Sequence, residues 1–177
     1  MEGILLIRHM FVEIAAMKVL ISAFLFTLAL AAAPPDPVTW KITDGPLRPV
    51  KVGTNFSVTL MATVTPGWRI YSMKPVVGGP TPTRIWVSPG QPFPPAGPIR
   101  ASTPNTLQDP TFHEKVEAYE GEARFLVPLR VPFNSDTGSL MLVVSLTYQA
   151  CNDRTCLPPK TVNIPQAIEI TPRSAPF

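Results

Sequence analysis

The sequence predicts an all-β domain built as a two-layer antiparallel β-sandwich. Three observations predict it: proline is abundant, apolar and polar residues alternate, and no stretch shows the repeat of a long helix. The 177 residues include 23 prolines, and proline breaks helices but is tolerated at turns and strand edges. About eight short strands separated by turn signals favour an immunoglobulin-like topology.

The expected strands follow from alternation along the chain. The clearest case runs from Phe56 to Val64, where apolar and polar residues take opposite parities, as in a strand with one face in water. The proline- and glycine-rich stretch 89–98 is interpreted as a surface loop. The expected strands cover residues 38–43, 56–64, 68–73, 83–88, 115–119, 125–131 and 140–148, with shorter ones at 162–164 and 168–170.

The N-terminus predicts export. Residues 17–31 combine one basic residue, an apolar run and a small-x-small ending, which is typical of a secretory signal peptide. Because Met17-Lys18 is itself a good signal-peptide start, residues 1–16 are interpreted as an upstream extension. The segment 32–177 is expected to form a single domain, since it is long enough for one core and too short for two. An uncleaved membrane anchor is the alternative that the sequence leaves open.

Charge and motif content exclude several classes of function. The formal net charge is +3, without a basic run or an aromatic-basic motif, so nothing points to nucleic acid. The mature chain would keep a single histidine, His113, and one histidine with two closely spaced cysteines does not make a zinc site. Glycine-rich phosphate loops, haem-attachment motifs and a serine–histidine–acid set are missing. We expect no cofactor and no metal.

The two cysteines, Cys151 and Cys156, enclose four polar, turn-prone residues. They lie between the strand that ends at Tyr148 and one that resumes near Thr161, so they close or flank the loop of a terminal hairpin, where a disulfide can form. A ring of about six residues contributes only about 2 kcal/mol as a staple. Compartment and spacing alone therefore allow either a structural bond or one that opens without unfolding the domain.

Several separated segments resemble a known family, the N-terminal periplasmic domain of the DsbD thiol:disulfide interchange protein, or disulfide bond corrector domain. Together they span roughly residues 38–171. The loop between the cysteines is one residue shorter here than in the family's best-known members. The similar segments are the cysteine signature at 148–151 and 156–159, the glycine-aromatic strand at 67–72 with the following segment 78–83, and the stretch 112–121 before and into a strand.

This resemblance implies a thiol:disulfide oxidoreductase that relays electrons. The domain would accept two electrons from a thioredoxin-like domain fed by a membrane-embedded conductor, and pass them to periplasmic thiol proteins. It further implies that Cys156 forms the mixed disulfide and Cys151 resolves it. Phe112 would cap the pair and Tyr71 would be a neighbouring aromatic residue of the site.

A second interpretation keeps the fold and changes the function: a secreted immunoglobulin-like binding or assembly module whose hairpin disulfide is purely structural. For the relay, we expect an electron donor in trans, because no conductor or second redox motif occurs in the sequence, and we expect a monomer. Trp68 and Trp86 are expected to pack in the core or at its rim. The acidic residues between 114 and 122 are expected on a solvated strand face.

Overall fold

The computed structural model describes residues 36–173 and forms an all-β domain there. The upstream extension and signal peptide predicted for residues 1–31 lie outside the described residues. Within residues 36–173, no helix is long and apolar enough to span a membrane. The strands are β1 (Val38–Asp44), β2 (Val50–Lys51), β3 (Asn55–Val64), β4 (Arg69–Tyr71), β5 (Arg84–Val87), β6 (Arg100–Ala101), β7 (Asn105–Gln108), β8 (Lys115–Tyr119), β9 (Glu122–Arg130), β10 (Gly138–Tyr148), β11 (Ala150–Cys151) and β12 (Lys160–Thr171).

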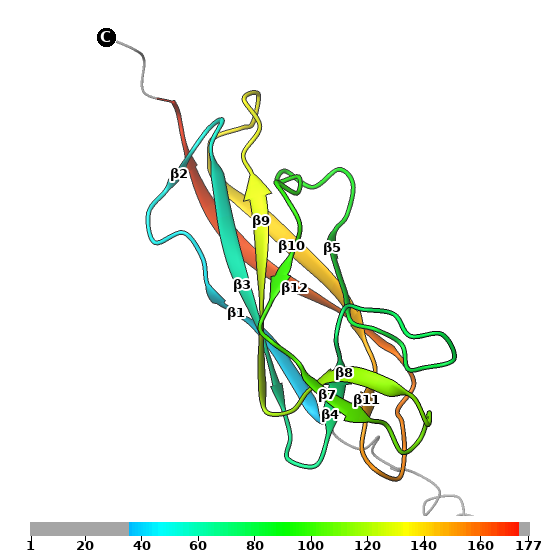
Figure 1. Cartoon of the computed structure of the whole chain (residues 1–177). Coiled ribbons are helices and arrows are strands. Elements are labelled where there is room, and N and C mark those ends of the chain that lie inside the picture. Colours follow the sequence, from blue (N-terminus) through cyan, green and yellow to red (C-terminus); the bar gives the residue numbers. More distant parts are fainter. Residues whose placement is uncertain (1–35, 174–177) are drawn as a thin grey trace, which may run out of the picture. The chain divides into compact units, whose positions relative to one another are not determined.

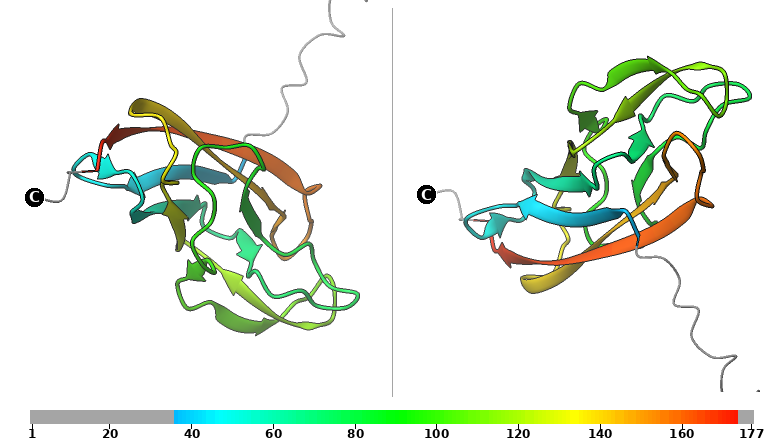
Figure 2. Two further views of the ribbon diagram at one scale, coloured as in Figure 1. Left: turned by 90° about the horizontal axis from the view of Figure 1, so that it is seen from above. Right: turned by 90° about the horizontal axis from the view of Figure 1, so that it is seen from below.

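Two four-stranded sheets pack face to face as an immunoglobulin-like sandwich, which confirms the predicted fold class. One sheet has the strand order β1-β3-β9-β6 and the other β2-β12-β10-β5. The two end-on views in Figure 2 show β12 and β10 on one side of the molecule and β1 and β3 on the other. A smaller third sheet, β11-β4-β8-β7, gathers at the end of the sandwich away from β2 (Figure 1).

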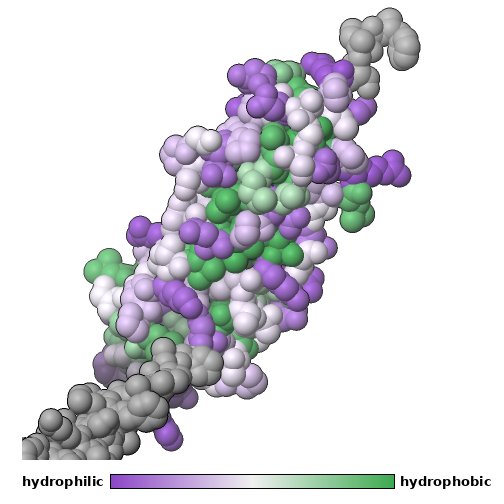
Figure 3. Space-filling view, turned by 180° about the vertical axis from the view of Figure 1, so that it is seen from behind, coloured by the Kyte–Doolittle hydropathy of each residue, from purple (hydrophilic) through white to green (hydrophobic). Residues whose placement is uncertain are grey.

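Alternation builds the core between the two large sheets. Every second side chain is buried in β9, in β3 from Val58 to Val64 and in β10 from Leu142 to Tyr148, as the pleat requires. The outer face of the β12–β10 sheet is mixed, and the view from behind in Figure 3 shows hydrophobic side chains in its middle among hydrophilic ones. The largest buried side chains from these three strands include Val58, Leu60, Phe125, Leu129, Leu142, Val144 and Leu146.

Two sequence-based expectations need correction. The short strands expected at 162–164 and 168–170 are one strand, β12, which runs through Pro165. The proline is tolerated because β2 pairs with β12 only at Ile170 and Thr171, so Pro165 borders a free edge. The stretch 89–98 is not a simple surface loop, because Phe93 is 0% exposed and packs edge-on against Phe56 at 5.3 Å.

The β10–β12 hairpin positions the cysteines. The two strands pair in antiparallel register from Gly138 opposite Ile170 to Tyr148 opposite Lys160, and the loop between them carries both cysteines. Asp36 fixes the chain beside this loop, since its carboxylate accepts hydrogen bonds from Tyr148 Oη at 2.5 Å and Lys160 Nζ at 2.6 Å. Burial raises the pKa of Asp36, but these bonds outweigh burial and leave it below its usual value.

Candidate redox site

The two cysteines form a disulfide whose Cα atoms lie 4.1 Å apart. Cys151 belongs to β11, which pairs with β4, while Cys156 faces it across an isolated antiparallel bridge. On the far side of that bridge, the N–H of Leu157 donates to the carbonyl of Ala150 at 2.9 Å. The backbone therefore holds the two residues opposite each other, whether or not the sulfurs are bonded.

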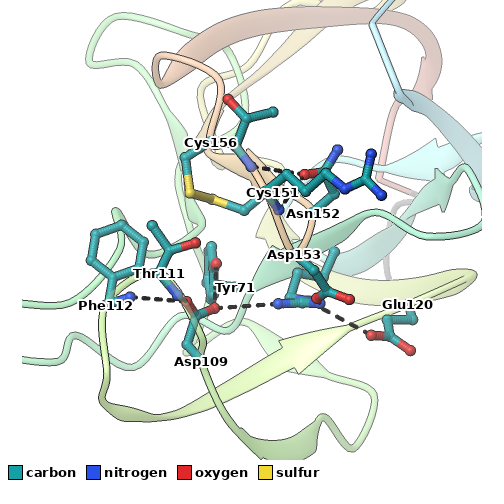
Figure 4. Close-up of polar contacts among 12 residues, drawn as sticks. Tyr71, Asp109, Thr111, Phe112, Glu120, Cys151, Asn152, Asp153 and Cys156 are labelled. Atoms are coloured by element: carbon teal, nitrogen blue, oxygen red, sulfur yellow. Dashed lines mark hydrogen bonds and ion pairs between the residues drawn. A yellow bond between two sulfur atoms is a disulfide. The ribbon is translucent and has the colours of Figure 1, made fainter.

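The loop between the cysteines is a self-contained turn. The N–H of Asn152 donates to the carbonyl of Thr155 at 2.9 Å. The side-chain oxygen of Asn152 accepts from the N–H groups of Arg154 and Thr155 at 2.9 and 2.8 Å, which is how asparagine stabilises a tight turn. Figure 4 shows this side chain turned into the loop beside the sulfurs. These local bonds define the turn, and Asp153 adds a contact to the rest of the domain.

The two sulfurs differ in exposure. Cys151 is 0% exposed, whereas Cys156 is half-buried. Cys151 belongs to a small apolar cluster, separate from the main core, with Tyr71, Val116 and Ala118. Cys156 is partly buried and packs against this cluster. Of the two cysteines, Cys156 is therefore the one nearer to solvent.

Phe112 and Tyr71, predicted as cap and neighbouring aromatic, lie in the same cluster as the cysteines. Their rings meet edge to face with centroids 6.3 Å apart. In Figure 4 the Phe112 ring lies beside the disulfide, on the segment that follows β7, while Tyr71 comes from β4. The structure thus brings together all four residues that the sequence singled out, from three distant segments of the chain.

Asp109 shapes the segment that carries Phe112. Its Oδ1 accepts from the N–H groups of Thr111 at 2.9 Å and Phe112 at 3.1 Å, and its Oδ2 accepts from Tyr71 Oη at 2.7 Å. Burial raises the pKa of Asp109, but these three bonds and the nearby Arg69 outweigh burial and hold it below its usual value. Burial and the same carboxylate carry the pKa of Tyr71 well above its usual value.

Arg69 lies at the centre of the polar contacts. It pairs with Cys151 in the β4–β11 register and is buried. Its Nη2 donates to the carboxylate of Asp153, between the cysteines, and its Nη1 lies 3.5 Å from Asp109 Oδ2. Its Nε lies 3.7 Å from Glu120 Oε1. Burial alone would lower the pKa of Arg69, but Asp153, with smaller contributions from Tyr71 and Asp109, raises it above its usual value.

Gln149 joins a further segment to the cysteine loop. Its Oε1 accepts from the N–H of Thr81 at 2.8 Å, and its Nε2 donates to the carbonyl of Leu157 at 3.2 Å. The segment 78–83 is thereby tied to the chain as it leaves Cys156. The segment 78–83 and the cysteine signature both belong to the sequence resemblance, and the fold shows that they are in contact.

The other sequence-predicted residues have simpler surroundings. Trp68 packs partly buried against the core, and Trp86 is 38% exposed on β5. The acidic residues expected on a solvated face also form ion pairs, since Glu117 lies 3.1 Å from Lys74 and Glu120 faces Arg69. His113 is exposed, and residues 36–173 contain no group of three or more His, Cys, Asp or Glu that could hold a metal.

Solved structures with a similar arrangement are distant from this chain. The N-terminal periplasmic domain of ScsB from Proteus mirabilis is 17% identical with a TM-score of 0.47, over 76% of this chain and 48% of that one. The chain thus spans about half the length of that structure. A family 123 glycoside hydrolase from Clostridium perfringens is 9% identical with a TM-score of 0.39, over 80% of this chain and 28% of that one. No curated protein sequence matches the chain.

A family model gives the assignment. The model described as "Thiol:disulfide interchange protein DsbD, N-terminal" matches residues 46–167, which include both cysteines, Phe112, Tyr71 and Arg69. Membership supports a general role in thiol:disulfide interchange and a periplasmic location. With its disulfide, its aromatic cluster and its sandwich fold, the chain belongs to the family of DsbD N-terminal thiol:disulfide interchange domains.

Proposed function

We propose that this domain is a periplasmic thiol:disulfide oxidoreductase that passes electron pairs through Cys151 and Cys156. One observation carries the proposal: a disulfide between one buried and one half-buried cysteine sits in a backbone-held turn against an aromatic side chain. A structural staple needs neither the difference in exposure nor the aromatic cover. A reversible redox pair uses both, because one sulfur must be reached and the other protected.

In the accepting half-reaction, a thiolate of the reduced donor attacks the Sγ of Cys156. The bond between Cys156 and Cys151 breaks, and its electron pair leaves on the Sγ of Cys151, which takes up a proton. The donor's second thiolate then attacks the donor sulfur of the mixed disulfide and releases Cys156, which takes up the second proton. The donor ends as a disulfide and the domain as a dithiol.

In the delivering half-reaction, the Cys156 thiolate attacks a disulfide of the acceptor. A mixed disulfide forms, and the acceptor's other sulfur leaves as a thiolate. The Cys151 thiolate then attacks the Sγ of Cys156, which restores the intramolecular disulfide and frees the acceptor as a dithiol. The bridge between the two cysteine backbones supports this assignment, because it keeps Cys151 beside Cys156 during the exchange.

The proposed partners follow from this chemistry. The donor is a thioredoxin-like domain, itself reduced by a membrane electron conductor and supplied in trans. The acceptors are downstream periplasmic thiol proteins, and the domain works as an exported monomer after its leader is removed. Phe112 shields the disulfide until a partner displaces it, and Tyr71 supports the Phe112 ring; the edge-to-face contact at 6.3 Å supports these roles.

Two measurements test the proposal. The Cys151→Ala variant should accumulate a mixed disulfide through Cys156 when mixed with an oxidised thioredoxin-like domain, whereas the matched Cys156→Ala variant should accumulate little. The wild-type pair, equilibrated in thiol redox buffers, should have a reduction potential above about −300 mV, as catalytic pairs do. A potential well below that value, with no trapped complex from either variant, would establish the structural staple instead.

A further inference from the structure

A continuous set of polar contacts links the cap segment, residues 109–114, to the cysteine loop, residues 151–156. It begins at the N–H of Phe112, which donates to Asp109. Asp109 lies 3.5 Å from the Arg69 guanidinium, and the same guanidinium donates to Asp153. One side chain from β4 therefore contacts both the segment that covers the disulfide and the loop that contains it.

The surroundings of Arg69 make these contacts hard to replace. Its side chain is 8% exposed and that of Asp109 is 0% exposed. Within the described part of the chain, its Nε and Nη1 are buried without hydrogen-bond partners, so the contacts with Asp109 and Glu120 are ion pairs without hydrogen bonds. The one hydrogen bond that the structure gives the guanidinium runs to Asp153. The cation therefore lies largely out of water, although its partners Asp153 and Glu120 are exposed.

Opening of the cap by a movement of its backbone must disturb this arrangement. If the backbone at Phe112 moves away from the disulfide, it either loses its N–H bond to Asp109 or draws Asp109 away from Arg69. The first choice leaves a buried carboxylate with fewer donors, and the second leaves a buried cation short of a partner, which is unfavourable. Because Asp153 is bonded to the same cation, the position of the cysteine loop is coupled to the position of the cap.

We infer that Arg69 is a positioning residue that latches the cap segment closed over the disulfide and so limits the rate at which thiols reach Cys156. The inference rests on the proposed shielding role of Phe112. It assigns no contact between Arg69 and the reacting thiol. Its effect is on access, and it acts through Asp109 and Asp153.

The test measures disulfide reduction by two small thiols of opposite charge, 2-mercaptoethanesulfonate and cysteamine, in stopped-flow assays. Asp153→Ala removes one end of the latch, and because Asp153 is 76% exposed the variant should fold. We expect both thiols to react about tenfold faster, the size expected for one charge-assisted hydrogen bond. A purely electrostatic role for Asp153 would instead speed the anionic thiol and slow the cationic one, and that outcome would overturn the inference.

Arg69→Met gives an independent check with the opposite electrostatic sign. Loss of a cation beside the disulfide should slow an anionic thiol, whereas loss of the latch should speed it. Lys74→Met is the matched control, since it removes a cation whose 3.1 Å ion pair with Glu117 lies outside the latch. Its rates should stay within about twofold of wild type. If Arg69→Met fails to fold, Asp153→Ala still decides, and rates unchanged from wild type overturn the latch.

The latch inference and the proposed relay function can be refuted independently of each other. A wild-type reduction potential well below about −300 mV would refute the proposed function. The ratio of variant to wild-type rates would still report on the latch, because small thiols need no biological partner.

Discussion

Reducing the disulfide should weaken the domain by only about 2 kcal/mol and leave it folded. The cysteines are separated by 5 positions, so the bond closes a very short ring. In the chain-entropy model, a ring of about six residues gives about 2 kcal/mol of stabilisation. No buried atom is removed by reduction, and the bond from the Leu157 N–H to the Ala150 carbonyl remains to hold the turn.

Urea unfolding with and without dithiothreitol measures this difference. Tryptophan fluorescence can follow it, because Trp40 packs against Phe125 in the core with ring centroids 5.6 Å apart. The slope of the free energy with urea should not change, and the melting temperature should fall by about 6 °C. Replacing both cysteines by alanine should have a larger effect, since the sulfur of Cys151 is fully buried. A loss above about 4 kcal/mol on reduction, or a broad transition, would refute the account of a backbone-held turn.

Three further predictions test separate parts of the structure. The pKa of Asp109 is lowered by folding, so its stabilising contribution is present above the unfolded pKa of about 3.9 and is lost as pH falls through the lower folded value. The stability gap between wild type and Asp109→Asn should therefore shrink in urea titrations below about pH 4, and a constant gap would contradict this. Gln149→Ala should leave the Thr81 N–H and the Leu157 carbonyl without these partners and destabilise the domain by about 1–3 kcal/mol. Amide hydrogen exchange at Thr81 should become faster, and an unchanged exchange rate would contradict this prediction. Phe93→Ala should lower the free energy of unfolding by about 3–5 kcal/mol in calorimetry, whereas a loss below about 1 kcal/mol would restore the surface-loop interpretation of 89–98.

The strands that the sequence predicts most clearly are those long enough to show alternation. β3, β9 and β10 have nine or more residues and bury mainly one parity of side chains, and that pattern is visible in the sequence. The strands β2, β6, β7 and β11 have two to four residues, too few to show a period, and they exist because a neighbouring strand offers hydrogen bonds. The burial of Phe93 was not predicted, for a related reason. The prolines and glycines of residues 89–98 indicate a loop, but they do not indicate which of its side chains is buried.

Sequence similarity locates the cysteines and aromatics of the site but not its charged residues. All three residues of β4 are buried, so its polar residue is not marked by a wet face. Arg69 becomes a neighbour of Cys151 only through the pairing of β4 with β11. Asp153, the partner of Arg69, lies 84 positions away in sequence. The contact between Arg69 and Asp109 depends on a further strand pair, β7 with β8, because Asp109 directly follows β7. Such long-range register is not contained in local patterns.

The site combines one local and one non-local device, and this division suits a relay. The cysteine turn is closed by bonds within residues 150–157, and Asp153 ties it to Arg69. The cap is held by Arg69 and Asp109 across sheet β11-β4-β8-β7, so its opening draws on contacts outside the turn. Because different interactions control bond exchange and access, a partner can displace the cap without unfolding the turn. In the proposed relay, the oxidised and reduced forms would then share one backbone, and the same surface of the domain would face a donor and an acceptor in turn.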